Sequence, residues 1–528
     1  MRRAALFHLV LLAGLLRPAD GAAQQFGATG SLTAYGELYS RDGIGTANRP
    51  DETGRITANL TLSLFNGLLT APLTAIISSD QVSFRQQINQ IGVSPTYKWA
   101  TFHAGNFTPE YSRYTIADAT LLGGGVDLHP GLFRIGAVYG RSRRAIAGNG
   151  NYTQIQWAQW MYGGRLGYGD EQKSFLDLFL VRGEDDRNSL DTAAVFPVPP
   201  VEASTVAGYK GQLSFGGGRV QLQSEGALSR YRRDELATNE EVTDKSAQVK
   251  LLFNSTVWSI GGTVEYVGPG FVTLGNSGLA GDRIDYGLTG SARLSGGRLA
   301  LQGMAGWREN NLDGDLEATA KQAIYNFSGS WQPGTAVGID WQVANNVNDN
   351  RARDDTSSIK NVTGVYSLTP RLLWRTGSVQ HVLVVAGSYQ SSENTTPGSI
   401  SLLDTKTTTV VANYTAAFAS SLSFIATATY TKVDLDTLGT SKITTVAPGL
   451  SYAFFNRKVQ AQAQAQFMHA DNPNGQNEHE VFPLVSLRWT VARGQSFLLR
   501  TSYRHHEFSN TGDFNEQIVS LQYSAAFR

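Results

Sequence analysis

Residues 459–467 read Val-Gln-Ala-Gln-Ala-Gln-Ala-Gln-Phe, a strict alternation of apolar and polar side chains. Successive side chains of a β-strand point to opposite faces, so this segment predicts a strand with one apolar face and one glutamine face. Glutamine is costly to bury without hydrogen-bond partners, so a dry core does not suit this pattern. The stretch therefore favours a sheet with lipid on one side and water or a polar lumen on the other, as in an outer-membrane β-barrel.

Weaker copies of the same alternation fill most of the remaining chain. Many of these segments exceed the roughly 9–11 residues that a tilted strand needs to cross a membrane. Strands of soluble sandwiches are usually about 5–6 residues long, so that fold is disfavoured. The predicted fold class is all-β, a transmembrane antiparallel up-and-down barrel.

The connections between the candidate strands alternate between very short and long. Short ones include Gly216–Gly218, Gly296-Gly297 and Asn456-Arg457, whereas 268–283 and 470–479 are long and polar. Outer-membrane barrels have short turns on the periplasmic side and longer loops outside. This layout predicts that both chain ends are periplasmic and that the strand number is even.

The strand count is ambiguous only between residues 80 and 118, where a candidate strand at 93–105 leaves an odd total. Residues 81–90 supply one more strand in the first interpretation, giving about 26. In the second, residues 80–118 fold inward as a constriction, giving about 24. We favour 26. The candidate constriction residues are Arg85, Tyr111, Arg113 and Tyr114.

The alternation also assigns side chains to the two faces. In the last strand, Val519 to Phe527 alternate with Ser520 and Gln522, so the apolar set is expected to face lipid. The predicted lumen-lining residues are Gln460, Gln462, Gln464, Gln466, Ser520 and Gln522. Charged strand residues should also face the lumen: Arg165, Lys210, Glu225, Lys250, Glu265, Arg293 and Asp340. Tryptophans near strand ends suit the membrane interfaces: Trp99, Trp157, Trp160, Trp258, Trp307, Trp331, Trp374 and Trp489.

Composition excludes several functions. Lys+Arg and Asp+Glu both number 44, so the balanced charge does not imply nucleic acid as a partner. The chain has no cysteine, which excludes disulfides, thiolate metal sites and cysteine catalysis. No motif of a hydrolase, P-loop protein or zinc protease is present. We therefore predict no enzyme, no catalytic or metal residues and no cofactor.

The N-terminus has the features of a secretion signal. Arg2 and Arg3 precede an apolar stretch from Ala4 to Leu16, and the small residues Gly21–Ala23 follow. We interpret residues 1–23 as a cleaved signal peptide and residues 24–528 as the barrel. The predicted location is the bacterial outer membrane, reached through the periplasm.

Two stretches resemble an uncharacterised family of large Gram-negative outer-membrane, porin-like barrels. One begins at Ser83–Gln86, continues through Asn89–Trp99 and Gly123–Leu128, and ends at Tyr139–Arg141; the other is Gly268–Asn276. The resemblance implies a barrel and an outer-membrane location. It implies no assigned activity and no functional residues.

These observations predict a wide, polar-lined passage, a porin or translocation pore, occluded by inward-folded segments or by a partner. The alternative is a structural scaffold that anchors or sheathes a partner, such as an adhesin or a secretion accessory, and an embedded enzyme is the third choice. Expected partners are outer-membrane lipid and lipopolysaccharide, the barrel assembly machinery during insertion, and a periplasmic or surface protein.

Overall fold

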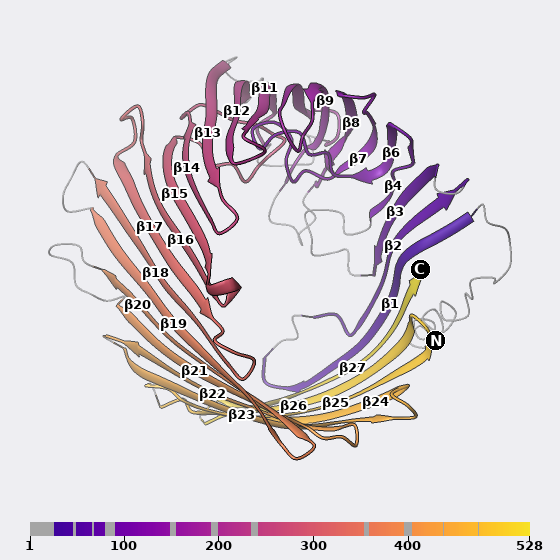
Figure 1. Ribbon diagram of the computed structural model, residues 1–528, viewed down its shortest axis with the longest axis vertical. Helices are drawn as coiled ribbons and strands as arrows, with labels where there is room; N and C mark the ends of the chain where they lie inside the picture. Colours follow the sequence, from indigo (N-terminus) through magenta and orange to yellow (C-terminus); the bar gives the residue numbers. More distant parts are fainter. Residues whose placement is uncertain are drawn as a thin grey trace.

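The strands form one antiparallel sheet that closes on itself. In the computed structural model, β1 (Phe26–Gly43) pairs with β2 (Glu52–Leu64) on one side and with β27 (Gly512–Phe527) on the other. Figure 1 shows the resulting ring, with β27 (yellow) beside β1 (indigo). The described residues are 26–45, 49–65, 68–79, 90–147, 155–191, 199–233, 241–352, 358–394, 404–436, 438–473, 475–509 and 511–527.

Strands follow one another around the ring in chain order. One 3-10 turn, η2 (Ser295–Gly297), lies between β15 and β16. The remaining strands are β3 (Leu69–Ser78), β4 (Gln90–Val93), β5 (Thr96–Tyr97), β6 (Ala100–Phe107), β7 (Leu121–Leu128), β8 (Phe133–Arg143), β9 (Ala158–Gly169), β10 (Phe175–Asp186), β11 (Glu202–Phe215), β12 (Val220–Arg233), β13 (Glu241–Asn254), β14 (Trp258–Val267), β15 (Arg283–Leu294), β16 (Leu299–Asn310), β17 (Ala318–Trp331), β18 (Val337–Ala352), β19 (Ile359–Thr376), β20 (Val379–Asn394), β21 (Thr405–Ala417), β22 (Leu422–Leu435), β23 (Gly439–Phe454), β24 (Val459–Asp471), β25 (Glu478–Ala492) and β26 (Gln495–Phe508).

The barrel has 26 strands. The sheet contains 27 strand segments, but β4 and β5 both lie between β3 and β6 and are two halves of one strand. The expected total of 26 is confirmed, and the alternative of 24 is wrong.

The predicted single strand at 93–105 is also wrong. Residues 93–97 are instead the end of one strand, and residues 100–105 are most of the next. A tight turn at Lys98-Trp99 joins the two strands, and Lys98 has a φ of 53° in this turn. Pro95 separates β4 from β5, since proline has no N–H for the ladder. The extra strand thus spans residues 90–97, whereas residues 81–89 lie outside the described part of the chain.

Cross-strand register defines the two faces. Paired residues share a face of the sheet. The pairs Phe179↔Gly208, Gly208↔Ala227 and Ala227↔Ser246 mark the inner face from β10 to β13. The same face can be followed from strand to strand as far as β27 and β1, where Glu516 pairs with Arg41. The opposite face carries most of the large exposed apolar side chains, such as Leu180 on β10. This apolar outer face makes the barrel a transmembrane one.

The face assignments made from sequence agree with this register. All seven charged strand residues predicted to face inward share the face of Phe179. Six of the eight tryptophans are exposed: Trp99, Trp258, Trp307, Trp331, Trp374 and Trp489. Trp157 does not fit the interfacial prediction. It is 3% exposed and its Nε1–H donates to the Pro199 carbonyl, because it packs inside a long connection instead of ending a strand.

The two ends of the barrel differ in their connections. At the end that holds the start of β1 and the end of β27, neighbouring strands are two to five residues apart. The two longest connections that are fully described, residues 108–120 and 268–282, leave the opposite end. Within the described residues no helix is long and apolar enough to cross a membrane.

Candidate functional site

Residues 108–120, between β6 and β7, fold onto the inner face of the wall. The Tyr111 ring stacks on Phe179, with centroids 5.5 Å apart, and Tyr114 meets Phe271 edge-on at 6.0 Å. Tyr114 has no exposed surface and Tyr111 is only 5% exposed. Aromatic burial of this extent holds the segment in one place.

A second connection, residues 268–282 between β14 and β15, folds inward to meet the first. The Thr273 hydroxyl donates to the Thr115 carbonyl at 2.8 Å, and the Ala117 N–H donates to the Gly275 carbonyl at 3.1 Å. A β-carbon on Gly275 would lie 2.1 Å from the Thr115 oxygen. Only glycine allows this approach, so the two connections form one docked unit, the inward pair (residues 108–120 and 268–282).

Buried Glu265 anchors the inward pair to the wall. Its carboxylate accepts hydrogen bonds from the Tyr114 hydroxyl at 2.9 Å, from Arg113 Nη1 at 3.3 Å and from Arg283 Nη2 at 3.4 Å. Burial, and then the Glu265 charge, raise the pKa of the Tyr114 hydroxyl far above its ordinary value. Tyr114 therefore remains a protonated donor at every physiological pH.

A second charged cluster lies on the wall near Tyr111. Asp177 accepts from Arg134 Nη2 at 2.6 Å and from Arg165 Nη2 at 2.9 Å. The side chains of Asp177 and Arg134 are 3% and 4% exposed. Removing one partner of such a buried pair typically costs about 3–5 kcal/mol, so loss of Asp177 or Arg134 would destabilise this part of the wall.

The candidate constriction residues have different surroundings. Tyr111 and Tyr114 are packed into the inward pair, whereas the Arg113 side chain remains 39% exposed beside Glu265. Arg85 lies outside the described residues. The six predicted lumen-lining residues all have the inner-face register: Gln460, Gln462, Gln464, Gln466, Ser520 and Gln522.

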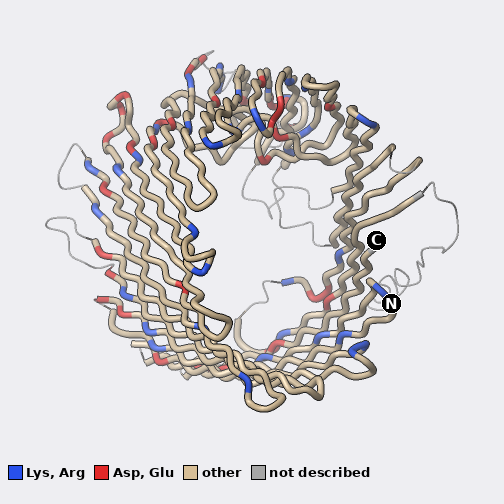
Figure 2. Tube along the Cα trace, in the orientation of Figure 1, with Lys and Arg blue, Asp and Glu red and all other residues tan. Residues whose placement is uncertain are grey.

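The wall from β20 to β24 differs from the wall that holds the inward pair. Among described residues, its inner face has no Asp, Glu, Lys or Arg side chain and is rich in hydroxyl and amide groups. In Figure 2 the middle stretches of these strands are tan, and the charges lie mostly at strand ends. The polar inner-face residues include Ser388, Gln390, Thr407, Thr409, Asn413, Thr415, Thr427, Thr429, Thr431, Thr445 and the four glutamines.

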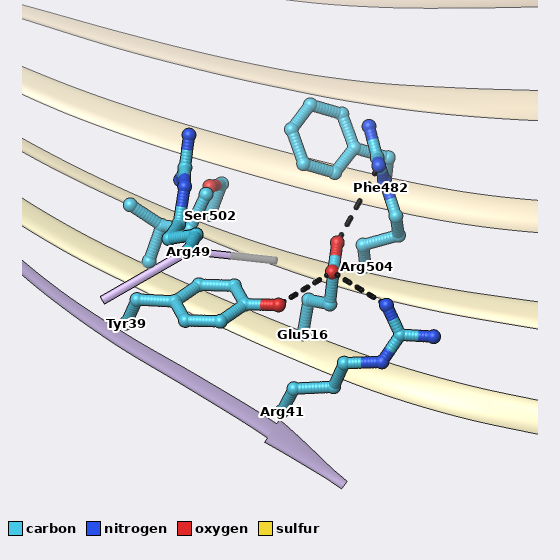
Figure 3. Close-up of a pocket in the computed structure, with 8 residues that line it drawn as sticks. Tyr39, Arg41, Arg49, Phe482, Ser502, Arg504 and Glu516 are labelled. Carbon is cyan, nitrogen blue, oxygen red and sulfur yellow. Dashed lines mark hydrogen bonds and ion pairs between the residues drawn. The ribbon is translucent and has the colours of Figure 1, made fainter. Parts of the chain in front are cut away.

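A cavity of about 460 Å³ lies on the inner face where the first and last strands meet. Its lining comes from β1, β25, β26 and β27, and from Arg49 before β2. Figure 3 shows Tyr39, Arg41 and Arg504 converging on Glu516. These residues lie at the end of the barrel with the long connections, so the cavity is at the external mouth.

Comparisons with known proteins give only distant matches. No protein-family description matches the sequence, and no curated protein matches it significantly. The P pilus usher (PapC) translocation pore aligns over 95% of this chain and all of its own, with 10% identity and a TM-score of 0.37. The outer membrane protein opdK from Pseudomonas aeruginosa aligns over 61% of this chain and 93% of its own (12% identity, TM-score 0.32). OccAB2 from Acinetobacter baumannii aligns over 62% and 93% (13% identity, TM-score 0.32).

Similarities at these TM-scores transfer no function. The family resemblance predicted a large barrel, and the closed barrel of the structure agrees with that prediction. Membership of the family itself is not shown, because no protein-family description matches the sequence. What the chain does has to be inferred from its own inner face.

Sequence reasoning missed two parts of this site. It did not bring Tyr114 to Glu265, because the two residues are separated by 151 positions. It also missed the mouth cavity, which needs the pairing of the first strand with the last. The even strand number implied that pairing, and a comparison of the two end strands for charged residues at matching heights would have found Arg41 and Glu516.

Chemically, the inner face offers hydrogen bonding and charge, without an evident reaction centre. In the part of the chain that the structure describes, no three His, Asp or Glu side chains lie close enough to hold a metal ion. The arrangement is suited to bind, guide or exclude a solute.

Proposed function

We propose that this protein forms a wide, polar-lined passage through the bacterial outer membrane, narrowed on one side by the inward pair. The observation that carries the proposal is the inner face followed from β10 around the ring to β1, opposite an apolar outer face. It carries all seven of the charged strand residues predicted to face inward, together with the hydroxyl and amide groups of β20 to β24.

The number of strands supports a passage instead of a filled core. With strands about 4.8 Å apart and tilted about 40°, 26 strands give a perimeter of roughly 160 Å and a circular width of roughly 50 Å. Barrels of 16–18 strands already leave an aqueous channel, so side chains alone do not fill this one.

The inward pair narrows this space asymmetrically. Most of its described hydrogen bonds and ring contacts go to the wall between β10 and β15, through residues such as Phe179, Glu225 and Glu265. Asp282 also accepts from the Asn311 and Leu312 N–H groups, between β16 and β17. The neutral wall from β20 to β24 lies elsewhere in the ring, as Figure 1 shows. A solute would thus pass between a charged, thickened wall and a neutral wall of hydroxyl and amide groups.

The location and partners form part of the same proposal. Residues 1–23, which are outside the described range, would direct secretion and be removed, and the assembly machinery would insert the barrel. Outer-membrane lipid and lipopolysaccharide would then cover the outer face. We propose no enzymatic role for this chain.

Single-channel recording in planar bilayers tests the passage. Thr108 and Thr120 lie side by side, with hydroxyl oxygens 3.1 Å apart, so a short glycine turn can replace residues 109–119 without breaking β6 or β7. We expect the intact protein to conduct and the shortened variant to conduct more. A matched control replaces the same residues with a shuffled sequence of equal length, which removes the docking contacts and keeps the bulk.

Absence of conductance in both the intact and the shortened protein, each folded, would contradict the proposal. A protein that copurifies in stoichiometric amount with a non-conducting barrel would favour the alternative, a scaffold that sheathes its partner.

A further inference from the structure

The mouth cavity contains three arginines, and each lies over an aromatic ring. The guanidinium carbon of Arg41 is 4.1 Å from the centroid of the Phe514 ring. Arg504 lies 5.1 Å from the centroid of Phe482, and Arg49 lies 5.3 Å from that of Tyr39. Stacking fixes the plane of a guanidinium group, and its N–H donors point outward from the edge. Two of these donors have partners in the chain: Arg41 Nη2 donates to the Ile44 carbonyl at 2.7 Å, and Arg49 Nη1 lies 3.0 Å from Glu37.

The acidic residue in this cavity does not saturate these donors. Glu516 accepts a good hydrogen bond from the Tyr39 hydroxyl at 2.7 Å, but Arg41 Nη1 and Arg504 Nη1 are each 3.4 Å from its oxygens. Charge-assisted N–H···O bonds are usually about 2.7–2.9 Å long. Glu516 is thus held mainly by a tyrosine and only loosely by the two arginines. Figure 3 marks these three contacts with dashed lines.

Two guanidinium nitrogens also lack a hydrogen bond. Nε of Arg41 and Nε of Arg504 are buried and have no hydrogen-bond acceptor among the described residues. Glu480 Oε2 is 3.5 Å from Arg504 Nε. Buried donors in native proteins nearly always have an acceptor, so these nitrogens point to an acceptor beyond the described residues.

We propose that this cavity binds the carboxylate of a small organic acid at the external mouth. Arginine N–H donors form short, charge-assisted hydrogen bonds to a carboxylate. Nη1 of Arg41 and Nη1 of Arg504, both held only loosely by Glu516, can offer such bonds from two sides. Tyr39, Phe482 and Ile518 add apolar lining for the body of the acid. A cavity of about 460 Å³ is within the range of small-molecule sites, about 300–1,000 Å³.

The charges around the cavity set how tightly an acid binds. The lining has three arginines and one carboxylate, a formal charge of +2. Glu37, 3.0 Å from Arg49, and Glu480, 3.5 Å from Arg504, lie just outside the lining and bring the formal charge of the whole group to zero. Glu516 is therefore the direct competitor of an incoming carboxylate. Neutralising Glu516 should strengthen carboxylate binding, whereas neutralising Arg41 or Arg504 beside it should weaken that binding.

Isothermal titration of the purified barrel in detergent, with benzoate as the probe, tests the site. Benzamide, which has the same shape without the charge, and inorganic phosphate are the comparison ligands. We expect benzoate to bind and benzamide and phosphate to bind at least tenfold more weakly. Arg504→Gln and Arg41→Gln should each weaken benzoate binding tenfold or more, whereas Glu516→Gln should strengthen it.

Arg308→Gln is the matched control, because Arg308 also lies on the inner face, but Asp285 occupies its donors at 2.7 and 2.9 Å. Its benzoate affinity should equal that of the wild type. Equal binding of benzoate and benzamide, equal binding of phosphate, or an Arg504→Gln protein that matches the Arg308→Gln protein would each overturn the proposal. Heat-modifiable migration in gels shows that every variant is folded.

This inference deepens the proposed function by naming a solute class, and the two fail separately. Benzoate binding without any conductance would refute the passage and leave the site intact. Conductance without benzoate binding would refute the site alone.

Discussion

Replacing Tyr114 by phenylalanine would remove one hydroxyl from the anchor of the inward pair and leave its packing unchanged. The ring would still contact Phe271, but Glu265 would lose the shortest of its hydrogen bonds, at 2.9 Å. Arg113 and Arg283 remain near the carboxylate, so Glu265 keeps its charge partners. The substitution therefore tests how much this single bond contributes to docking.

A hydrogen bond to a charged group contributes roughly 1.5–3 kcal/mol. Since about 1.4 kcal/mol changes an equilibrium constant tenfold, the released fraction of the inward pair should rise at least tenfold. We expect the lower end of this range, because the two arginines partly compensate the carboxylate.

The lack of native cysteine provides a clean assay. Ala227 on β12 is 7% exposed and packs with Tyr114 and Val206. An Ala227→Cys reporter should thus react with a water-soluble maleimide only when the inward pair leaves the wall. Under conditions where labelling follows the open fraction, Tyr114→Phe should speed labelling about tenfold or more.

Tyr503→Phe is the matched control, because it removes an exposed hydroxyl that bonds Asn515 on the outer face. Its labelling rate should equal that of the reporter alone. If Tyr114→Phe labels no faster than Tyr503→Phe, Glu265 does not hold the inward pair in place and the docking argument is wrong.

Three further predictions concern the contact within the inward pair, the two faces of the wall and the turn between β5 and β6. Gly275→Val should also speed labelling of the Ala227→Cys reporter, because its β-carbon would lie 2.1 Å from the Thr115 oxygen, whereas Gly278→Val should not, since only the Asn276 side chain is near. Ala463→Arg, on the outer face of β24, should lower the free energy of unfolding by roughly 2–4 kcal/mol, the cost of an arginine on the lipid face near the membrane midplane. The neighbouring inner-face Gln464→Arg should change this free energy little. Urea titration in lipid vesicles would measure both, and equal losses would refute the face assignment. The pair Val93→Cys and Ala104→Cys should form a disulfide on oxidation, since these residues face each other across β4 and β6, whereas one continuous strand would keep them far apart; gel mobility before and after reduction decides between these.

The sequence was sufficient to predict features that repeat along the chain. Alternation of apolar and polar residues depends only on the period of a strand, so the inner-face register of Lys250 and Arg293 followed directly from it. The difference between short turns and long loops also repeats, and it fixed the common end of the barrel for both chain termini. The requirement for an even total showed that one strand had been miscounted, although it did not place the missing strand at residues 90–97.

Features that occur once were not predictable in this way. The turn at Lys98-Trp99 contains neither glycine nor proline, and Lys98 adopts a left-handed conformation that its sequence does not announce. The contact between Thr273 and Thr115 depends on where two connections meet in space, 158 positions apart in the chain. Burial of Trp157 similarly depends on the distant Pro199.

The apolar side chains of residues 108–120 explain why this segment folds inward. The ladder of β6 and β7 ends at Phe107 and Leu121, where these residues begin and end. The chain between them cannot continue as wall, and its apolar residues Tyr111 and Ile116 would be exposed to water at the mouth if it stood upright. Folding inward buries them against Phe179 and Val181. The inward position of this segment therefore follows from its own apolar side chains, which are buried only when it lies against the inner face of the wall.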